Sequence, residues 1–362
     1  MLRDYSLTGP NGTEDRPDGL AKVNWYRTKV DPAKLRELSQ KQDARPLRDA
    51  VLWLGLLIST GAIAAMMWPS PWAIPIWLAY GVLYSSASDA RWHECGHRTA
   101  FKTPWLNEAI YQIASFCLIR SPIVWRSSHV RHHTDTIVVG RDPEIQAMRP
   151  PDLLKLFANV FGLMELRVNL QRLALHAMGR LHPDEATYVR DQDLPKIVHT
   201  ARIWVVIFAA TILTAIWTWS LLPLMLIGGP RLYGTWHMVM TGTLQHLGLA
   251  ENVTDHRLNT RTVLMNPVTR FIYLNMNYHV EHHMFTMVPY YNLPALHDLI
   301  GHDLPAPEPS IPAAFRRMLP VLWRQLHYQD AVIVYDLPDT AAPYRPEVAA
   351  LRSHAVPDLA PT

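Results

Sequence analysis

Histidine is concentrated in three short clusters of this 362-residue chain. Eight of the 18 histidines fall within the segments HECGH, HVRHH and HVEHH, as His93, His97, His129, His132, His133, His279, His282 and His283. Residues three or four positions apart project from the same side of a helix, so each cluster presents two or three imidazoles on one face. Neutral imidazole is a common nitrogen ligand of transition metals. The clusters therefore predict metal binding.

The number of imidazoles indicates more than one metal ion. A catalytic zinc ion usually has three protein ligands, and eight imidazoles exceed that number. Two ions fit the count, and nitrogen ligands with open coordination positions suit iron that activates O2. His246, at the end of an apolar segment, is predicted as a ninth ligand; the alternative is an interfacial histidine bonded to water. His237 is expected deeper in that segment, and His256 at the surface of a polar loop.

Long segments without charged residues indicate a membrane protein. Residues 51–88 carry no formal charge, and they are too numerous for one crossing, because a spanning helix needs about 20 residues. The sequence Pro69-Ser70-Pro71 divides them into two helices joined by a tight turn. A second hairpin is predicted from 203–220 and about 224–246. Arg231 lies inside this last segment, where a charge is costly unless it faces protein or water.

The distribution of Lys and Arg predicts the orientation of these helices. Both turns, near 69–71 and 219–223, lack Lys and Arg, whereas the first 50 residues and the segment 89–202 are rich in them. By the positive-inside rule, both termini and the central segment are cytoplasmic. The predicted fold is an all-α integral membrane protein. It has four transmembrane helices in two hairpins, an interfacial helix at 105–118, and a cytoplasmic helical cap, with helices in 151–180 and 311–328, that carries the metal site.

The composition agrees with a chain that is partly embedded in lipid. Charged residues make up 18% of the sequence, against about 25% in soluble proteins. The net charge of +3 is too small to argue for a nucleic-acid partner. Cys95 and Cys117 form no recognisable disulfide framework.

The three clusters, in this order and between two apolar hairpins, resemble the histidine boxes of the membrane fatty acid desaturase and hydroxylase superfamily. The segment NYHVEHHMF…VPYYNLPALH is similar to bacterial desaturases. The resemblance implies a di-iron centre held by the eight box histidines and His246, with O2 as co-substrate and a fatty-acyl or other aliphatic substrate. It also implies a desaturase domain over 50–300, between a cytoplasmic segment at 1–49 and a cytoplasmic helix and irregular tail at 301–362. The expected location is the bacterial inner membrane.

Two departures from family patterns bear on the site and its electron supply. Acyl-CoA desaturases carry an Asn one turn before the His at the end of the fourth span, where this chain has Gly242; Asn275 is a candidate replacement. Front-end desaturases begin the third box with Gln, where this chain has His279. No HPGG haem-binding motif occurs in the sequence. Electrons are therefore expected from a separate ferredoxin, cytochrome b5-type protein or flavoprotein reductase.

Other residues are candidates for supporting roles. Carboxylates and amides beside the boxes could orient the imidazoles, although each could equally be a loop or cap residue: Asp89, Asp135, Asp142 and Asn275. Three aromatic residues could line a substrate channel or simply pack against lipid or protein: Trp92, Tyr233 and Trp236. Glu94 and Glu281 lie inside boxes, where we expect them to face outward rather than to bind metal.

The same residues allow alternative functions. A di-iron hydroxylase of an aliphatic compound or small specialised metabolite would use the same ligands. HECGH also satisfies HExxH, the zinc-protease pattern with Glu94 as general base, but no further Asp ligand is found in a later span and two boxes remain unused. A metal transporter would place its ligands within the spans, whereas these boxes lie beyond the predicted span ends.

Overall fold

The computed structural model describes residues 3–9, 24–344, 351 and 355. Within these residues the regular secondary structure is helical, and β pairing is confined to isolated bridges such as Thr262–Tyr278. The predicted all-α class is therefore confirmed for this part of the chain. Residues 1–2, 10–23 and most of the chain beyond 344, which include parts of the two predicted cytoplasmic terminal segments, lie outside the described residues.

The first hairpin has the predicted break. It consists of α3 (Ala44–Met66) and α4 (Ile74–Gly96), joined through a short 3-10 helix at Pro71–Ala73. The hydroxyl of Ser70 accepts a hydrogen bond from the Trp72 amide and so caps that turn. Between the two helices, the indole of Trp53 is fully buried and donates to the carbonyl of Leu83 at 2.9 Å. This contact fixes the register of α3 against α4.

The second hairpin differs from the prediction in its last part. The helix α9 (Leu194–Trp217) is continuous, but the single helix predicted over 224–246 is wrong. The chain instead forms three short helices, α10 (Leu222–Leu226), α11 (Pro230–Tyr233) and α12 (Thr235–Gly242). Gly228 takes a φ of 80°, which favours glycine, and Pro230 has no amide hydrogen to continue a helix. Gly234 lies so close to α4 that an added Cβ would be 1.9 Å from the Gly81 carbonyl oxygen.

Among the described residues, two helical segments are long and apolar enough to cross a membrane, α3 and Asp191–Trp217, which contains α9. Only 28% and 22% of their apolar windows are buried inside the protein, so they are not the core helices of a soluble domain. Large apolar side chains such as Ile58 and Val206 are exposed on them. Continuous exposed apolar surface of this kind is typical of contact with lipid. Membrane crossing by the four predicted spans remains a prediction, as does the cytoplasmic orientation.

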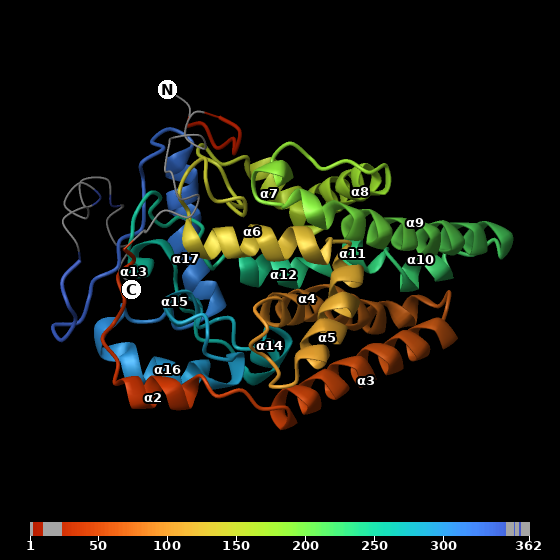
Figure 1. Ribbon diagram of the computed structural model, residues 1–362. Coiled ribbons are helices and arrows are strands. Elements are labelled where there is room, and N and C mark those ends of the chain that lie inside the picture. The colour runs from red at the N-terminus through yellow and green to blue at the C-terminus, as the bar shows by residue number, and fades with distance from the viewer. Residues whose placement is uncertain (1–2, 10–23, 345–350, 352–354, 356–362) are drawn as a thin grey trace.

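Helices α2 (Pro32–Leu38), α13 (His256–Asn259), α15 (His279–Met284) and α16 (Leu293–Ile300) gather at one end of the hairpins, whereas α5 (Pro104–Leu118) and α8 (Leu163–Ala177) pack along α4 and α9 (Figure 1). We refer to the helices gathered at that end as the cap. In Figure 1 the hairpin turns lie at the opposite end from α2, α13, α15 and α16. The largest buried apolar cluster joins the first hairpin to this cap. The helix predicted over 105–118 is present as α5, and the segments 151–180 and 311–328 contain α7, α8 and α17. The cap and connecting helices are α2 (Pro32–Leu38), α5 (Pro104–Leu118), α6 (Pro122–Thr134), α7 (Leu153–Val160), α8 (Leu163–Ala177), α13 (His256–Asn259), α14 (Pro267–Ile272), α15 (His279–Met284), α16 (Leu293–Ile300) and α17 (Ile311–Gln325).

A buried ion-pair network explains the charge inside the predicted fourth span. The guanidinium of Arg231 on α11 is fully buried and lies 2.9 Å from a carboxylate oxygen of Glu165 on α8. The same carboxylate pairs with Arg120, which also lies 3.0 Å from Asp89 on α4. Two arginines and two carboxylates thus offset one another, so Arg231 faces protein rather than lipid.

Candidate metal centre

The histidine boxes converge from four separate parts of the chain. His93 and His97 stand at the carboxyl end of α4, and the second box lies in the last two turns of α6. The third box forms α15, and His246 follows α12. Gly96 permits part of this approach, because a Cβ there would lie 2.3 Å from the Trp125 ring of α6. That ring stacks on the imidazole of His129 with centroids 4.3 Å apart.

The imidazoles form two groups. In the first, the nitrogens of five histidines all lie within 4.8 Å of one another, namely His93, His97, His129, His133 and His282. In the second, the same holds for His132, His246 and His283. His279 joins the second group, since its Nε2 lies 3.2 Å from Nε2 of His246 and 3.1 Å from that of His283. All nine predicted ligands therefore meet in one region.

The distances between Nε2 atoms suit ligands that share an ion. They are 3.0 Å for His129–His97 and His129–His133, and 3.2 Å for His133–His282. Two nitrogens that are each about 2.1 Å from one ion and at right angles would be about 3.0 Å apart. Two groups of imidazoles at this spacing offer places for two ions.

Hydrogen bonds at the opposite ring nitrogens orient several imidazoles. The Nδ1 of His129 is 2.8 Å from Oε2 of Glu144, and the Nδ1 of His132 is 2.8 Å from Oδ2 of Asp142. The Nδ1 of His246 is 2.8 Å from the carbonyl oxygen of Asn259. A carboxylate or carbonyl can only accept, so these bonds place the proton on Nδ1 and leave the Nε2 lone pair directed into the cluster.

The electrostatics of the cluster also favour a bound cation. Burial lowers the pKa of His246 to about 3 and holds the pKa of His283 well below its ordinary value, so both rings are neutral. His132 is the exception to this neutral set, because burial lowers its pKa but the Asp142 carboxylate and Glu144 together raise it by more. The Nδ1 and Nε2 atoms of His93 are buried without a hydrogen-bond partner among the described residues. Neutral, buried and partly unpaired imidazoles are the donor set that a transition metal requires.

Two histidines outside the nine predicted ligands, His256 and His237, are also buried. His256 was expected at the surface but is 2% exposed, with its ring centroid 5.1 Å from that of His283. The short helix α13 carries it inward, which the polar sequence around it does not reveal. His237 is buried on α12, as its position in the apolar segment predicts, and its Nδ1 lies 2.7 Å from the Ser86 hydroxyl.

Four residues were proposed to orient the imidazoles. One of them, Asp142, hydrogen-bonds to an imidazole, that of His132. Asp89 pairs with Arg120, and Asp135 with Arg141 at 3.3 Å. Asn275 accepts from Arg270 and donates to the carbonyl of Tyr290. Glu144 was not identified from the sequence. Its only signal is its place two residues after Asp142 in the loop that follows the second box.

The two glutamates inside the boxes do not face outward. Glu94 and Glu281 are both completely buried. Glu94 accepts hydrogen bonds from the Thr99 hydroxyl at 2.7 Å and the Tyr290 amide at 3.2 Å. Glu281 accepts from Thr262 and pairs with His297. Each glutamate thus ties its box to neighbouring segments of the chain.

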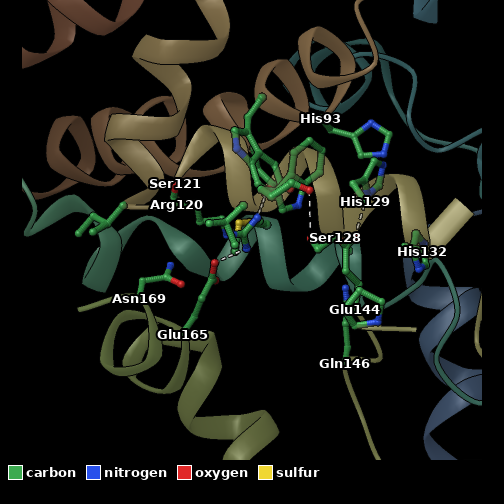
Figure 2. A pocket seen from close by; sticks show the side chains of 18 of the residues that line it. His93, Arg120, Ser121, Ser128, His129, His132, Glu144, Gln146, Glu165 and Asn169 are labelled. Atoms are coloured by element: carbon green, nitrogen blue, oxygen red, sulfur yellow. Dashed lines mark hydrogen bonds and ion pairs between the residues drawn. The ribbon is translucent and has the colours of Figure 1, made fainter. Parts of the chain in front are cut away.

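A cavity of about 360 Å³ opens onto the cluster. In Figure 2 His93, His129 and His132 lie at one end, and Arg120, Glu165 and Asn169 lie at the other. Apolar residues of α8 and α9, such as Leu173 and Trp204, also contribute to the wall. The cavity therefore combines a metal-binding end with an ion-paired polar end.

The three aromatic residues proposed for a channel lie in different environments. Trp92 lines the cavity and contacts the guanidinium of Arg120, 4.4 Å from its ring centroid. Tyr233 packs on Trp77 and donates to the carbonyl of Met225 at 2.6 Å. Trp236 is 39% exposed. A packing or lipid-facing position, the alternative raised by the sequence, describes Tyr233 and Trp236.

Comparison with known proteins identifies the family. The fatty acid desaturase family matches residues 66–313. An endoplasmic reticulum omega-6 fatty acid desaturase of Glycine max is 25% identical over 260 residues, covering 62% of this chain and 65% of the relative. An acyl-lipid (9+3)-(E)-desaturase of Dimorphotheca sinuata is 23% identical over 257 residues, covering 62% and 66%. An sn-1 oleoyl-lipid 12-desaturase of Picosynechococcus is 25% identical over 266 residues, covering 67% and 74%.

The match thus spans slightly less than two thirds of the length of the first two relatives. The family match covers more than half of this chain, including all three histidine clusters and His246. The chain belongs to the fatty acid desaturase family.

Proposed function

We propose that the protein is an O2-dependent desaturase whose nine clustered histidines hold two iron ions. The observation that carries this proposal is the convergence of two imidazole groups, with Nε2 atoms 3.0–3.2 Å apart, at the end of a cavity. His93, His97, His129, His133 and His282 would hold one ion, and His132, His246, His279 and His283 the other. When bound, a nitrogen-ligated iron pair with open positions supplies the O2 chemistry needed to remove hydrogen from an unactivated C–H bond.

The chain's own residues would orient the site and shield it from water. Glu144, Asp142 and the Asn259 carbonyl keep a proton on Nδ1 of three imidazoles and hold those rings in place. Trp125, stacked on His129, and Trp92 behind it cover the cluster with apolar surface. Exclusion of water by these rings strengthens electrostatic interactions inside the site.

The cavity suggests how a substrate would lie. An aliphatic segment would extend toward His93 and His129, and a polar group would lie at the end formed by Arg120, Glu165 and Asn169. Buried charged groups favour a ligand group that can hydrogen-bond to them, because an apolar ligand would leave them less solvated. The relatives act, by their names, on fatty acids or acyl lipids, which supports an acyl lipid as the substrate class.

Product analysis tests this function. Cells of one host would express either the wild-type chain or His133→Ala, and their lipids would be extracted and compared. We expect a lipid lacking two hydrogens in wild-type cells grown in air, but not in the variant or without O2. Lys155→Ala, at an exposed position on α7, should behave as wild type. An alcohol as the sole product would contradict desaturation in favour of hydroxylation. Peptide hydrolysis that depends on Glu94 would contradict both.

A further inference from the structure

A succession of three aromatic rings, of which the first two are stacked, leads from the surface to the histidine cluster. Trp25 lies in segment 24–30, which has no regular secondary structure, and is partly exposed. Its indole stacks on the imidazole of His256, with centroids 4.2 Å apart and planes inclined by 4°. The ring of His256 is in turn 5.1 Å from that of His283. Three π systems in succession thus lead from a partly exposed side chain to a proposed iron ligand.

The stack is held on both sides by hydrogen bonds. The indole nitrogen of Trp25 donates to the carbonyl of Thr134 at 2.9 Å, directly after the second histidine box. The amide of Tyr26 donates to the carbonyl of Thr254 at 2.8 Å. Arg257, the neighbour of His256, lies 3.7 Å from the Tyr26 ring centroid. These contacts attach segment 24–30 to α13, so the two rings keep a fixed spacing.

Exposed cations accompany Trp25. Arg27 and Lys29 follow Trp25 by two and four residues, with the buried Thr28 between them. Both are exposed. Among the described residues, no carboxylate forms an ion pair with either side chain. Exposed cations of this kind attract an acidic protein partner.

We propose that Trp25 and His256 form the route by which electrons enter the metal centre, and that a small acidic one-electron carrier protein docks over Arg27 and Lys29. The proposal rests on the proposed function, because only a redox-active centre needs such a route. Each docking would deliver one electron. Two electrons and two protons from water, one O2 and two hydrogens from the substrate balance to one alkene and two water molecules. Electron transfer slows steeply with the gap between donor and acceptor, and the stacked rings shorten that gap.

Reduction kinetics test the ring stack. The iron-loaded, oxidised full chain in detergent would be mixed with a chemically reduced plant-type [2Fe–2S] ferredoxin, an acidic one-electron carrier, and separately with reduced methyl viologen. We expect Trp25→Leu to slow reduction by ferredoxin several-fold and Trp25→Phe, which keeps a ring, to slow it less. Reduction by methyl viologen should be unchanged in both. If the Trp25 variants fold poorly, His256→Leu and His256→Phe form a second pair for the same measurement, with the same expected order.

Binding of the metal-free protein provides an independent measurement. The double variant Arg27→Glu, Lys29→Glu should weaken binding of oxidised ferredoxin and lower its association rate about tenfold or more at low salt. The matched control Lys155→Glu changes an exposed cation on α7 and should have no such effect. The proposal would be overturned if ferredoxin reduced both Trp25→Leu and His256→Leu at the wild-type rate. Unchanged ferredoxin binding by the double variant would also overturn it. Absence of reduction of the wild-type protein by methyl viologen would count instead against the proposed iron centre.

Discussion

The Nδ1 atom of His132 lies 2.8 Å from a carboxylate oxygen of Asp142, which is completely buried. The same carboxylate accepts hydrogen bonds from the backbone amides of Ile137 and Glu144. Asp142 therefore folds the loop after the second box back onto that box. It fixes the imidazole of His132 and also places Glu144, which orients His129 in the same way.

Substitution of Asp142 should weaken metal binding. Loss of a carboxylate partner of a ligating imidazole typically costs about 10–100-fold in metal affinity. We expect Asp142→Asn to lower iron affinity by about this factor, as measured by competition with a chelator. Asp339→Asn, at an exposed position near the end of the described chain, is the control. Unchanged iron affinity in Asp142→Asn would show that the carboxylate supports only the loop.

The contact of Gly81 with Gly234 should tolerate no side chain. A Cβ on Gly234 would lie 1.9 Å from the Gly81 carbonyl oxygen, so Gly234→Ala must move α12 away from α4. Overpacking of this kind costs about 1–3 kcal/mol, and the movement should lower iron content through His246. Gly55→Ala on α3 is the matched control, because nothing lies within 4 Å of its added Cβ. It should instead raise the melting temperature, since Gly inside a helix costs about 0.5–1 kcal/mol relative to Ala.

Gly242 offers a way to fill the cavity without touching the metal ligands. It lines the cavity, and the nearest atom to an added Cβ is the Gln146 amide nitrogen at 3.8 Å. We expect Gly242→Leu to raise the substrate KM or abolish product formation while iron content stays unchanged. Gly242→Ala should have a smaller effect in the same direction. Full activity of Gly242→Leu would exclude this cavity as the substrate site.

The ion pair of Arg231 and Glu165 should be a large contributor to stability. Removal of one partner of a buried pair leaves an uncompensated charge, which costs about 3–5 kcal/mol. Glu165→Ala should therefore lower the free energy of unfolding by about this amount, measured by denaturant titration in micelles. The exposed pair of Asp152 and Lys155, with side chains 49% and 71% exposed, is the comparison. Its disruption should cost at most about 1 kcal/mol. Equal effects at the two sites would contradict the buried network.

The sequence predicted the parts of the molecule that follow from local pattern. The sequence Pro69-Ser70-Pro71 predicted the end of α3, and the charge-free segments predicted α3 and α9. Both signals come from residues that are neighbours in the sequence. The histidine spacing predicted which imidazoles share a helical face. His246, which has no cluster around it, was proposed because it ends an apolar segment, and it lies with the box histidines.

The remaining features depend on contacts between distant segments. The break between α10 and α11 has a local cause in Gly228 and Pro230, whereas the junction of α11 with α12 at Gly234 packs against Gly81, a contact that the sequence does not reveal. Arg231 is paired with Glu165, which lies 66 positions earlier in the sequence, so its place inside an apolar segment cannot be explained from its neighbours. His256 was expected at the surface because its neighbours are polar, yet Arg257 and Asp255 pair with each other inside the protein. The contacts of Glu144 with His129 and of the Asn259 carbonyl with His246 were not predicted either, because they depend on how loops fold onto the histidines.

Metal analysis of the purified full-length protein tests the central claim most directly. Mass spectrometry of the metal content would count the ions. Mössbauer spectroscopy of protein produced in medium containing iron-57 would characterise them. The two imidazole groups predict two iron ions per chain. Joint replacement of His97 and His282 by Ala should remove the ion of the five-histidine group, whereas His327→Ala, remote from both groups in sequence, should retain both. A single zinc ion in the wild-type protein, or two irons retained after the joint replacement, would contradict this account.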